Sequence, residues 1–395
     1  MSNSVLGMKY IKEIKPGTYR IHMRIGKSLD GKNLYDTKQL SNVSLREVQK
    51  LRDEMWKSRD GKMGIDSNIK VVDFARLYLQ DHAFHSHTGT TYDGEESKLR
   101  NHVIPYLGNY KMKDVTPMII QKLINFLAEK DSLRHDKEGN VVKLSATTIR
   151  NVYNIVCAMF TKAVELKIIT ATPCTGITLP RGSKYQATVY NIDEMNHLLE
   201  CFQDSQLSIQ KKCIFILAMS TGMRRGELGG LLKEDIDFEN KIVYIRNSLS
   251  QSKSKGEELK DTKSEAGVRP VGLNDISIEM LKLHLKEQER LKKNSQVKWP
   301  NIPNVFTDEC GNPISLNSIT HSWSRFILRH KLKYVKLHGL RASFATFLAY
   351  KGYPPKVVQA LLGHANERTT MKFYQFAYEG YATSILDTTN EIGKK

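Results

Sequence analysis

The chain has 395 residues, 40% of them hydrophobic and 26% charged, and this length and balance predict two or three folded domains rather than one. Its 60 lysines and arginines outnumber its 42 aspartates and glutamates and give a formal net charge of +18, which predicts a polyanionic partner, with nucleic acid as the leading candidate. The sequence has no recognisable secretory leader and no apolar run of membrane-spanning length, so we expect a cytoplasmic protein with no membrane partner.

Residues 1–62 are predicted to form a small domain in which a three-stranded sheet precedes one helix. Apolar and polar residues alternate in the strands, and the turn-forming sequences KPG and SLDGK separate them. Ser44 and Glu47 have the spacing of a capping box at the start of the helix. Arg20 and Arg24 lie on the polar face of the second strand, where we expect them to contact DNA phosphates. The expected strands and helix are Lys9–Ile14, Thr18–Gly26, Asn33–Leu40 and Val43–Lys57.

Residues 68–179 have a helical pattern, with apolar residues at spacings of three and four. Thr116 and Ser145 are typical helix starts, and the charged stretch Lys130–Asn140 is predicted to be a surface loop. Thr172–Lys184 contains two prolines and two glycines and is the strongest candidate for a domain boundary. The basic residues that we expect to contact DNA here are Lys98, Arg100, Arg150, Arg181 and Lys184.

Residues 185–395 are predicted to combine helices with a short sheet. Asn240–Gln251 and Gly267–Asn274 alternate as strands do and flank a charged stretch, whereas the segments around them have helical patterns. No Walker-type phosphate loop and no G-x-G-x-x-G sequence occurs, so nucleotide-driven chemistry is not expected. The whole chain is therefore predicted to be a multidomain α+β protein, mainly helical with small β-sheets.

Two adjacent arginines follow an apolar helix in the stretch STGMRRGELGGLLKEDID, residues 220–237. Arg224 and Arg225 begin a new helix whose first turn also contains Glu227. Cations at a helix N-terminus oppose the macrodipole, so stability alone does not favour this arrangement. A bound anion would gain from both the guanidinium groups and the free backbone donors. A surface cluster of salt bridges with Glu227 is the alternative interpretation.

A histidine and an arginine share one helical face in KLHGLRASFATFLAYKG, residues 336–352. His338 and Arg341 are three positions apart, so they could grip one phosphate from two directions. Upstream, Leu259–Leu273 is predicted to be a hairpin with Lys263 at its tip. Each of these features is common in isolation, and only their order along the chain is informative.

A second histidine and a tyrosine follow the helix predicted from YPPKVVQALLGH, residues 353–364. That helix begins at its prolines and is capped by Gly363, which leaves His364 just beyond the cap. Tyr374 is expected about one turn into a further helix, in which phenylalanines are better core candidates than the tyrosine. The candidate caps of that further helix are Thr369 and Thr370, and its expected core residues are Phe373 and Phe376.

Six of these residues, in this order, resemble the catalytic signature of the tyrosine recombinases, the phage-integrase family. TGMRRGEL is similar to the first arginine box, TKSEAGVRPVGL to the lysine hairpin, HGLRASFATFL to the H-x-L-R box and LLGHANERTTMKFY to the final box. Gly339 and Ser343 depart from the pattern, because many relatives have an acidic residue and a threonine there. The six residues are Arg224, Lys263, His338, Arg341, His364 and Tyr374.

The resemblance implies a site-specific DNA recombinase, an integrase that cleaves and rejoins strands through a 3′-phosphotyrosine intermediate to integrate and excise a phage or conjugative transposon. It implies an arm-site-binding domain at residues 1–62, a core-site-binding domain at 68–179 and a catalytic domain with a C-terminal tail at 185–395. The expected partners are double-stranded attachment sites of core and arm type, three further copies in a homotetramer on DNA, and an excisionase or host DNA-bending protein. The expected location is the bacterial cytoplasm, at the nucleoid.

The resemblance assigns Tyr374 as the nucleophile, because a phosphotyrosine bond stores the cleaved linkage for attack by another strand. A tyrosine hydroxyl, with a pKa of about 10, needs a base and strong neutralisation of the phosphate charge at neutral pH. Arg224 and Arg341 would bracket the non-bridging oxygens, since the guanidinium fork donates paired hydrogen bonds to an oxyanion. Glu227 would hold the first arginine in place without contacting DNA.

The remaining roles by resemblance concern proton transfer. His338 would help to move the proton of the nucleophile, His364 would donate to the same phosphate, and Lys263 would protonate the departing 5′ oxygen. We expect no metal and no other cofactor, because the arginines supply the positive charge that a metal ion would otherwise bring. The cluster DHAFHSH has no fourth ligand type nearby, and the five cysteines form no C-x-x-C pair. The histidines of that cluster are His82, His85 and His87.

The alternatives are a type IB topoisomerase and a non-catalytic DNA-binding regulator built on the same fold. A type IB topoisomerase would share the chemistry and relax DNA as a monomer, but it has no need of the N-terminal sheet domain. A non-catalytic DNA-binding regulator would be expected to lack at least one catalytic position, and none is missing here.

Overall fold

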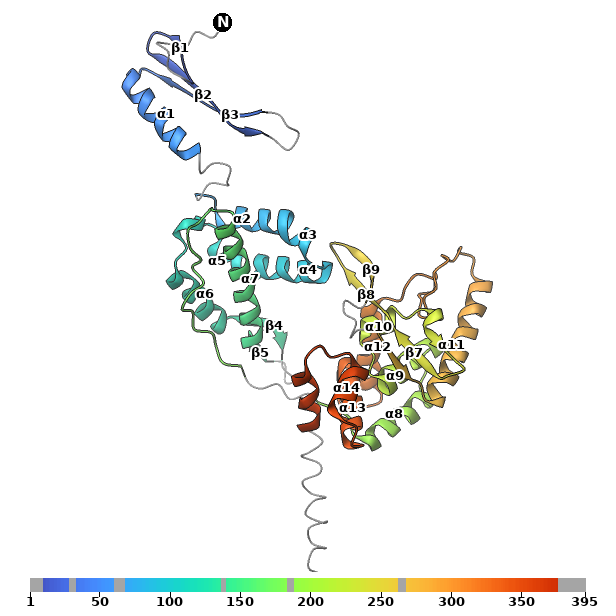
Figure 1. Ribbon diagram of the computed structural model, residues 1–395. Coiled ribbons are helices and arrows are strands. Elements are labelled where there is room, and N and C mark those ends of the chain that lie inside the picture. Colours follow the sequence, from blue (N-terminus) through green and yellow to red (C-terminus); the bar gives the residue numbers. More distant parts are fainter. Residues whose placement is uncertain are drawn as a thin grey trace, which may run out of the picture. The chain divides into compact units, whose positions relative to one another are not determined.

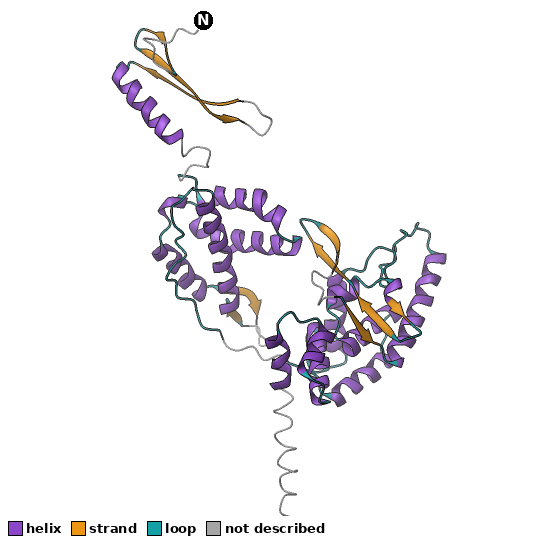
Figure 2. Cartoon of the chain, viewed as in Figure 1, coloured by secondary structure: helices purple, strands orange, loops and turns teal. Residues whose placement is uncertain are grey.

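The computed structural model describes residues 10–27, 33–59, 68–135, 140–182, 188–261 and 268–375. The chain divides into two compact units, residues 1–183 and 184–395, which are described in turn. Helices and small sheets make up both (Figures 1 and 2), so the prediction of a mainly helical chain with small sheets is confirmed. Among the described residues, no helix combines the length and apolar character needed to cross a bilayer. The three functional domains remain a prediction.

The first unit begins with an antiparallel sheet in the order β1-β2-β3, followed by helix α1. The backbone N–H of Ser44 donates to the Glu47 carboxylate at 2.9 Å, so the predicted capping box is present. A small core joins the sheet to the helix, and its buried residues are Ile11, Ile21, Met23, Val48 and Met55. The elements are β1 (Ile11–Lys15), β2 (Thr18–Lys27), β3 (Asn33–Ser41) and α1 (Leu45–Arg59).

The rest of the first unit is a helical bundle around a separate core that includes Phe74, Leu99, Ile124 and Phe160. Ser145 accepts a hydrogen bond from the Thr148 amide at 3.1 Å, which confirms this predicted helix start. The elements are α2 (Val71–Leu77), η2 (Tyr78–Ala83), α3 (Phe84–Ser86), α4 (Gly89–Lys98), η3 (Leu99–Val103), α5 (Ile104–Leu107), η4 (Met112–Asp114), α6 (Pro117–Glu129), β4 (Asp131–His135), β5 (Val141–Lys143) and α7 (Ala146–Glu165).

The prediction that Lys130–Asn140 is a loop is wrong in its first half, because β4 pairs with β5 there. All of β5 is exposed, including Val141 and Val142. It is held by backbone pairing and by an ion pair between Lys143 and Glu129. Alternating hydrophobicity marks only strands that bury one face, so the pattern could not reveal this one.

The second unit packs helices around two small sheets, one in the order β10-β7-β6 and the other formed by β8 and β9. Its core includes Phe202, Phe215, Trp323 and Phe326, whose rings contact one another. Residues 367–375 are also helical. The elements are α8 (Ile192–Asp204), α9 (Ile209–Thr221), α10 (Arg225–Gly229), η5 (Lys233–Asp235), β6 (Ile236–Asp237), β7 (Ile242–Ile245), β8 (Asn247–Ser252), β9 (Gly256–Asp261), β10 (Arg269–Gly272), α11 (Asp275–Asn294), α12 (Leu316–Arg329), α13 (Leu337–Tyr350) and α14 (Pro355–Leu362).

Two strand predictions need correction in this unit. Asn240–Gln251 is not one strand, because the chain changes sheet at Arg246, between β7 and β8. Leu259–Leu273 is not a simple hairpin, because β9 pairs with β8 whereas β10 pairs with β7. Sequence alternation gives the faces of a strand but not its partner, so this exchange leaves no trace in the pattern. Lys263 lies outside the described residues.

Helix α13 is fixed to the core at its N-terminal end. The indole of Trp323 donates to the carbonyl of Val335 at 2.7 Å, just before the helix begins. The hydroxyl of Ser343 accepts from the Tyr190 amide at 2.9 Å, and the Tyr190 hydroxyl donates to the Lys333 carbonyl at 2.6 Å. A Cβ at Gly339 would lie 2.4 Å from a Val335 methyl group, so the packing explains why this family-variable position is glycine here.

Gly222 ends α9 in a left-handed conformation with φ of +66°, and a Cβ there would lie 2.8 Å from Leu362. We expect Gly222→Ala to lower the free energy of unfolding by about 2–4 kcal/mol, from backbone strain together with overpacking. The matched control is Gly256→Ala, because Gly256 has φ of +69° and nothing within 4 Å of the added carbon. That variant should lose only about 1–2 kcal/mol of strain. Urea unfolding followed by tryptophan fluorescence measures both, and equal losses would contradict the packing argument.

Candidate active site

The first arginine of the site stands on a sharp turn between two helices. Gly222 is the cap at the end of α9, and Arg224 is the cap residue just before α10. The backbone N–H of Arg224 donates to Glu227 at 2.8 Å, and its Nη1 donates to the other carboxylate oxygen at 2.6 Å. The Arg224 side chain is 40% exposed, whereas that of Glu227 is 2% exposed. The turn therefore places the Arg224 guanidinium at the surface, where a buried carboxylate beneath it accepts its hydrogen bond.

A third charged residue, Arg269, reaches the same carboxylate from strand β10. Its Nη2 donates to Glu227 Oε2 at 2.8 Å and its Nη1 to Glu227 Oε1 at 3.2 Å. Its Nε donates to the carbonyl of Leu361 at 2.6 Å. Glu227 thus lies between two guanidinium groups from different parts of the chain.

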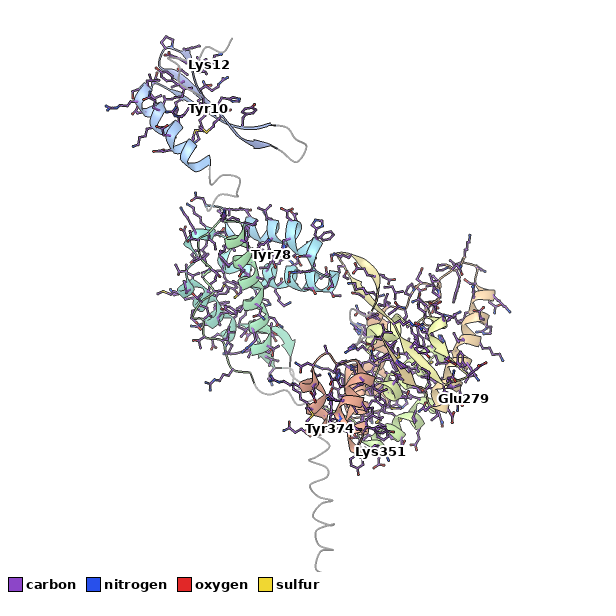
Figure 3. The ribbon with its side chains drawn as sticks, viewed as in Figure 1. Tyr10, Lys12, Tyr78, Glu279, Lys351 and Tyr374 are labelled. Atoms are coloured by element: carbon purple, nitrogen blue, oxygen red, sulfur yellow. The ribbon has the colours of Figure 1, made fainter. Side chains whose placement is uncertain are left out.

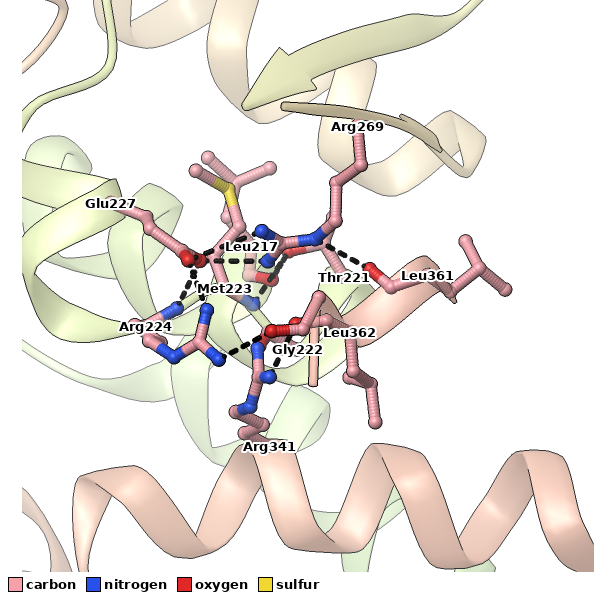
Figure 4. A network of polar contacts seen from close by, with 11 residues as sticks. Leu217, Thr221, Gly222, Met223, Arg224, Glu227, Arg269, Arg341, Leu361 and Leu362 are labelled. Atoms are coloured by element: carbon pink, nitrogen blue, oxygen red, sulfur yellow. Dashed lines mark hydrogen bonds and ion pairs between the residues drawn. The ribbon is translucent and has the colours of Figure 1, made fainter. Parts of the chain in front are cut away.

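Arg341 completes a group of arginines that converge on the end of α14 (Figure 4). Its Nη1 donates to the carbonyl of Gly222 at 2.8 Å and its Nη2 to the carbonyl of Leu362. Arg224 Nη2 donates to the carbonyl of Gly363 at 2.8 Å. The last carbonyls of a helix lack intrahelical partners and carry the negative end of its dipole, so they are natural acceptors for cations. The carbonyls used here belong to Leu361, Leu362 and Gly363.

The group carries more positive than negative charge. Burial opposes ionisation of Glu227, but the hydrogen bonds and charges of Arg269 and Arg224 outweigh it and hold the pKa of this carboxyl below its usual range. Burial, together with the charge of Arg224, lowers the pKa of Arg341 to about 9, so this guanidinium is still protonated at neutral pH. A phosphate that entered would relieve the mutual repulsion of the arginines.

His338 lies next to these arginines, on the rim of a groove of about 570 Å³ that Arg224 also lines. Partial desolvation and then the charges of Arg341 and Arg224 lower the pKa of His338, which keeps its imidazole neutral at physiological pH. A neutral imidazole beside an anion site can accept a proton. The groove is also lined by Arg225, Thr320, Ser324, Tyr334 and Lys336.

His364 follows the cap of α14, which Gly363 forms in a left-handed conformation as predicted. Its Nδ1 shares a 2.9 Å hydrogen bond with the Thr370 hydroxyl, and its backbone carbonyl accepts from the Gln359 amide. Burial, followed by the charges of Arg341, Arg224 and Arg269, lowers the pKa of His364 to about 4. The ring is therefore neutral at pH 7, with its orientation fixed by Thr370.

The predicted cap of the next helix is wrong. Residues 367–375 are helical, and the Asn366 side chain accepts from the Arg368 amide at 2.9 Å, so Asn366 is the cap in place of Thr369 or Thr370. Asparagine caps as well as threonine does, and a cap three residues earlier leaves Thr370 inside the helix, where it can reach His364.

Tyr374 is buried, with 7% of its surface exposed, against α13 and α14 (Figure 3). The prediction that Phe373 would be a better core residue is therefore wrong, since Phe373 is only half-buried; Phe376 lies outside the described residues. The shift in the helix start rotates the tyrosine toward the core. Its core neighbours are Ala345, Leu348, Ala349, Val358 and Leu362.

The hydroxyl of Tyr374 donates to the backbone carbonyl of Tyr353, which precedes α14. The arginines donate to carbonyls at the opposite end of the same helix. Eight helical residues at 1.5 Å each separate these ends by about 12 Å. The structure thus brings together Arg224, Glu227, Arg341, His338 and His364, and it packs Tyr374 against α13 and α14 with its hydroxyl bonded to the Tyr353 carbonyl.

The predicted DNA-contact residues lie mainly on the surface. Arg20, Arg100, Arg150 and Arg181 are exposed, and Arg100 forms an ion pair with a glutamate one helical turn away. Lys98 is half-buried and donates to a backbone carbonyl at 2.9 Å. The side chain of Arg24, and Lys184 as a whole, lie outside what the structure describes. Their contacts with DNA remain predictions.

The histidine cluster of the first unit lies on η2 and α3. The rings of His82 and His87 have centroids 5.7 Å apart, and His87 Nδ1 contacts Glu95 at 3.0 Å. In the described part of the chain, no three side chains of the metal-binding types are placed to share an ion.

Sequence reasoning missed Arg269 and the partner of His364. Arg269 alternates with Val271 and Leu273, all of them buried, so an arginine in phase with the apolar face of a strand was the available indication. Thr370 gave no such indication, because a threonine in a polar stretch fits a cap or an exposed turn equally well.

The sequence model of the phage integrase family matches residues 189–379, and that of the phage integrase N-terminal SAM-like domain matches residues 70–128. The chain belongs to the tyrosine recombinase family. Tyrosine recombinases are DNA strand transferases, so this chain is an enzyme of site-specific recombination.

Several members of the tyrosine recombinase family are similar to this chain, two of them over most of their length. A XerC-like tyrosine recombinase of Caldanaerobacter subterraneus subsp. tengcongensis is 27% identical, over 97% of this chain and 98% of its own. The integrase of Mycobacterium phage L5 is 25% identical, over 91% and 90%. The transposase from transposon Tn916 of Enterococcus faecalis is 28% identical, over 45% and 44%.

Solved structures show the same fold. The integrase of transposon Tn1549, in complex with a circular intermediate DNA, has a TM-score of 0.63 at 20% identity and covers 78% of this chain and 95% of its own. A lambda integrase tetramer bound to a Holliday junction has a TM-score of 0.53 at 16% identity and covers 92% and 94%. The fold prediction is therefore confirmed as that of a tyrosine recombinase.

We expect the imidazole of His364 to stay neutral from about pH 8 down to about pH 5, whereas an unperturbed histidine titrates near 6.5. The cause is burial beside the arginines. NMR titration of histidine-labelled protein tests this, with His364→Gln identifying the resonance. An oligonucleotide duplex bound at the site should raise this pKa, because its phosphate adds negative charge. A midpoint near 6.5 in the free protein would contradict the geometry.

Proposed function

We propose that this recombinase is an integrase whose catalytic residues are Arg224, Arg341, His338, His364 and Tyr374, with Lys263 as the general acid. The observation that supports it best is the convergence of three arginines on the end of α14, two of them paired with one buried carboxylate, beside a groove and a neutral histidine. Such a site neutralises an anion without a metal ion, which is what cleavage of a phosphodiester requires.

In this proposal the scissile phosphate occupies the groove edge between Arg224 and His338. Arg224 and Arg341 exchange bonds to helix carbonyls for stronger, charge-assisted bonds to the phosphate oxygens. His338 accepts the proton of the Tyr374 hydroxyl as its oxygen attacks phosphorus. The bond between phosphorus and the 5′ oxygen breaks, and Lys263 donates a proton to that oxygen. Glu227 keeps Arg224 in place and does not contact DNA.

The nucleophile must move before it can react. The Tyr374 hydroxyl has to leave the Tyr353 carbonyl, which precedes α14, and reach the arginines at the other end of this helix, which is about 12 Å long. Residues 367–375 form a short helix joined to α14 by only a few residues, so the segment can swing while α14 stays on the arginines. DNA binding or assembly with other copies would then favour the moved position of this segment, and only that position would allow cleavage.

The proposal extends to partners and setting. The lambda integrase structure is a tetramer on a Holliday junction, and we propose the same stoichiometry for this chain on its attachment sites. Residues 1–62 would bind arm sites, residues 68–179 core sites and residues 185–395 would catalyse. An excisionase or host DNA-bending protein would set direction, in the cytoplasm of a bacterium at its nucleoid.

Tyr374→Phe should bind core-site DNA as the wild type does but form no covalent protein–DNA adduct, because only the attacking oxygen is removed. The assay is a nicked suicide duplex carrying the element's own junction sequence, resolved by denaturing gel electrophoresis. Tyr350→Phe, an exposed tyrosine on α13, is the matched control and should form the adduct normally. An adduct that survives in Tyr374→Phe would overturn the assignment and direct attention to Tyr378 and Tyr381.

Deleting residues 1–62 should leave adduct formation on the suicide duplex intact and abolish integration that requires arm sites. The reason is that α1 and its sheet have their own core, separate from that of the helices that follow. Integration between two plasmids in cells measures the loss, and adduct yield of the same variant is the control. Unchanged integration would remove the proposed arm-binding role.

A further inference from the structure

Arg269 has each of its nitrogens engaged inside the protein. Nη1 and Nη2 donate to the two oxygens of Glu227, and Nε donates to the Leu361 carbonyl. The side chain is 5% exposed and its Nε, Nη1 and Nη2 all have partners within the protein, so we assign it no contact with a DNA phosphate. In contrast, the Arg224 side chain is 40% exposed at the groove. Arg269 therefore differs from Arg224 in what it can contact, although both hold the same carboxylate.

The stability of the fold does not by itself explain why position 269 is an arginine. A buried ion pair is often no more stabilising than apolar side chains of the same volume, because both ions lose hydration. Arg269 alternates with buried Val271 on β10, a position where an aliphatic residue would pack. The contacts of Arg269 instead link the carboxylate under Arg224 to the end of α14, the two features on which the catalytic arginines are mounted.

Glu227 could hold Arg224 in two ways. With Arg269 present, both carboxylate oxygens already accept from it. Besides its backbone N–H, Arg224 then donates only Nη1 to Glu227, and its Nη2 donates to the Gly363 carbonyl at 2.8 Å. Without Arg269, the carboxylate would have one guanidinium partner, and the favoured geometry is the paired fork that uses both terminal nitrogens. Arg224 would then turn toward Glu227 and away from the groove.

We propose that Arg269 is a positioning residue for strand cleavage: it occupies Glu227 and anchors Leu361, so that the fork of Arg224 stays free to exchange onto the scissile phosphate. The inference rests on the proposed function of this site. Arg269 acts through Glu227 and α14 and does not touch DNA.

The test compares Arg269→Met with the wild-type full-length chain. Single-turnover adduct formation on the suicide duplex should slow about 10–100-fold, the range for a catalytic group displaced by about 1 Å. Affinity for the same duplex, measured by fluorescence anisotropy, should not change, because Arg269 contacts no DNA. A loss confined to affinity would overturn the proposal.

A pH profile separates positioning from general damage. The charged and titratable groups that face Glu227 are Arg224 beside it, Arg269 on β10, and Arg341 and His338 on α13. Removing Arg269 takes away the largest opposing charge, so the pKa of the buried carboxyl rises. Cleavage by Arg269→Met should therefore fall on the acidic side at a higher pH than in the wild type. The double variant Glu227→Gln/Arg269→Met should lack this shift, and a shift that persists would refute action through Glu227.

Two further variants guard against misfolding. Arg269→Lys keeps the buried charge but lacks the fork, and it should cleave at a rate between those of the wild type and Arg269→Met. Arg246→Met removes another arginine paired with a buried carboxylate, Asp235 at 2.7 Å, outside the site. Arg246→Met should not change the pH at which the cleavage rate falls on the acidic side. If Arg269→Met is unfolded by circular dichroism, the Arg269→Lys rate and profile decide, and wild-type values there would overturn the proposal.

The outcomes also separate this inference from the proposed function. A wild-type chain that forms no Tyr374-dependent adduct would defeat the proposed function. A normal wild-type adduct with Arg269→Met cleaving at the wild-type rate would defeat only the role of Arg269.

Discussion

The buried carboxylate of Glu227 is the interaction on which the rest of the site depends. An unpaired charge at this depth would be strongly destabilising, so the fold must supply cations around it. It does so from the turn after α9 and from β10, and these cations in turn hold the last carbonyls of α14. One carboxylate therefore links segments that are far apart in the sequence. The arginines near it repel one another, and a bound anion would reduce that repulsion.

Helix α14 serves two purposes, one at each end. Its C-terminal carbonyls accept hydrogen bonds from the arginines, and the Tyr353 carbonyl before its N-terminus accepts one from the Tyr374 hydroxyl. A phosphate offers a guanidinium a stronger, charge-assisted bond than a carbonyl does, so the arginine contacts are suited to exchange. In the proposed mechanism the tyrosine contact must also be given up.

The sequence was sufficient for the residues that chemistry demands and insufficient for the contacts that place them. Arg224, His338 and Arg341 stood out because their types and order suit an oxyanion. The pairing of β8 with β9 could not be predicted, because alternation shows which face of a strand is buried but not which strand lies beside it. Burial of Tyr374 was missed for a related reason: the helix begins at Asn366, and a change of start by three residues rotates every side chain after it.

The first residues of the second unit have a structural consequence. Residues 188–190 do not simply lead into the fold, because the Tyr190 amide bonds to Ser343 in the middle of α13 and the Tyr190 hydroxyl bonds to Lys333 just before it. The side chain of Lys333 adds a third hydrogen bond, to the Val189 carbonyl at 2.9 Å. The start of the second unit is thus bonded directly to the helix of His338 and Arg341, and Tyr190 also belongs to the hydrophobic core.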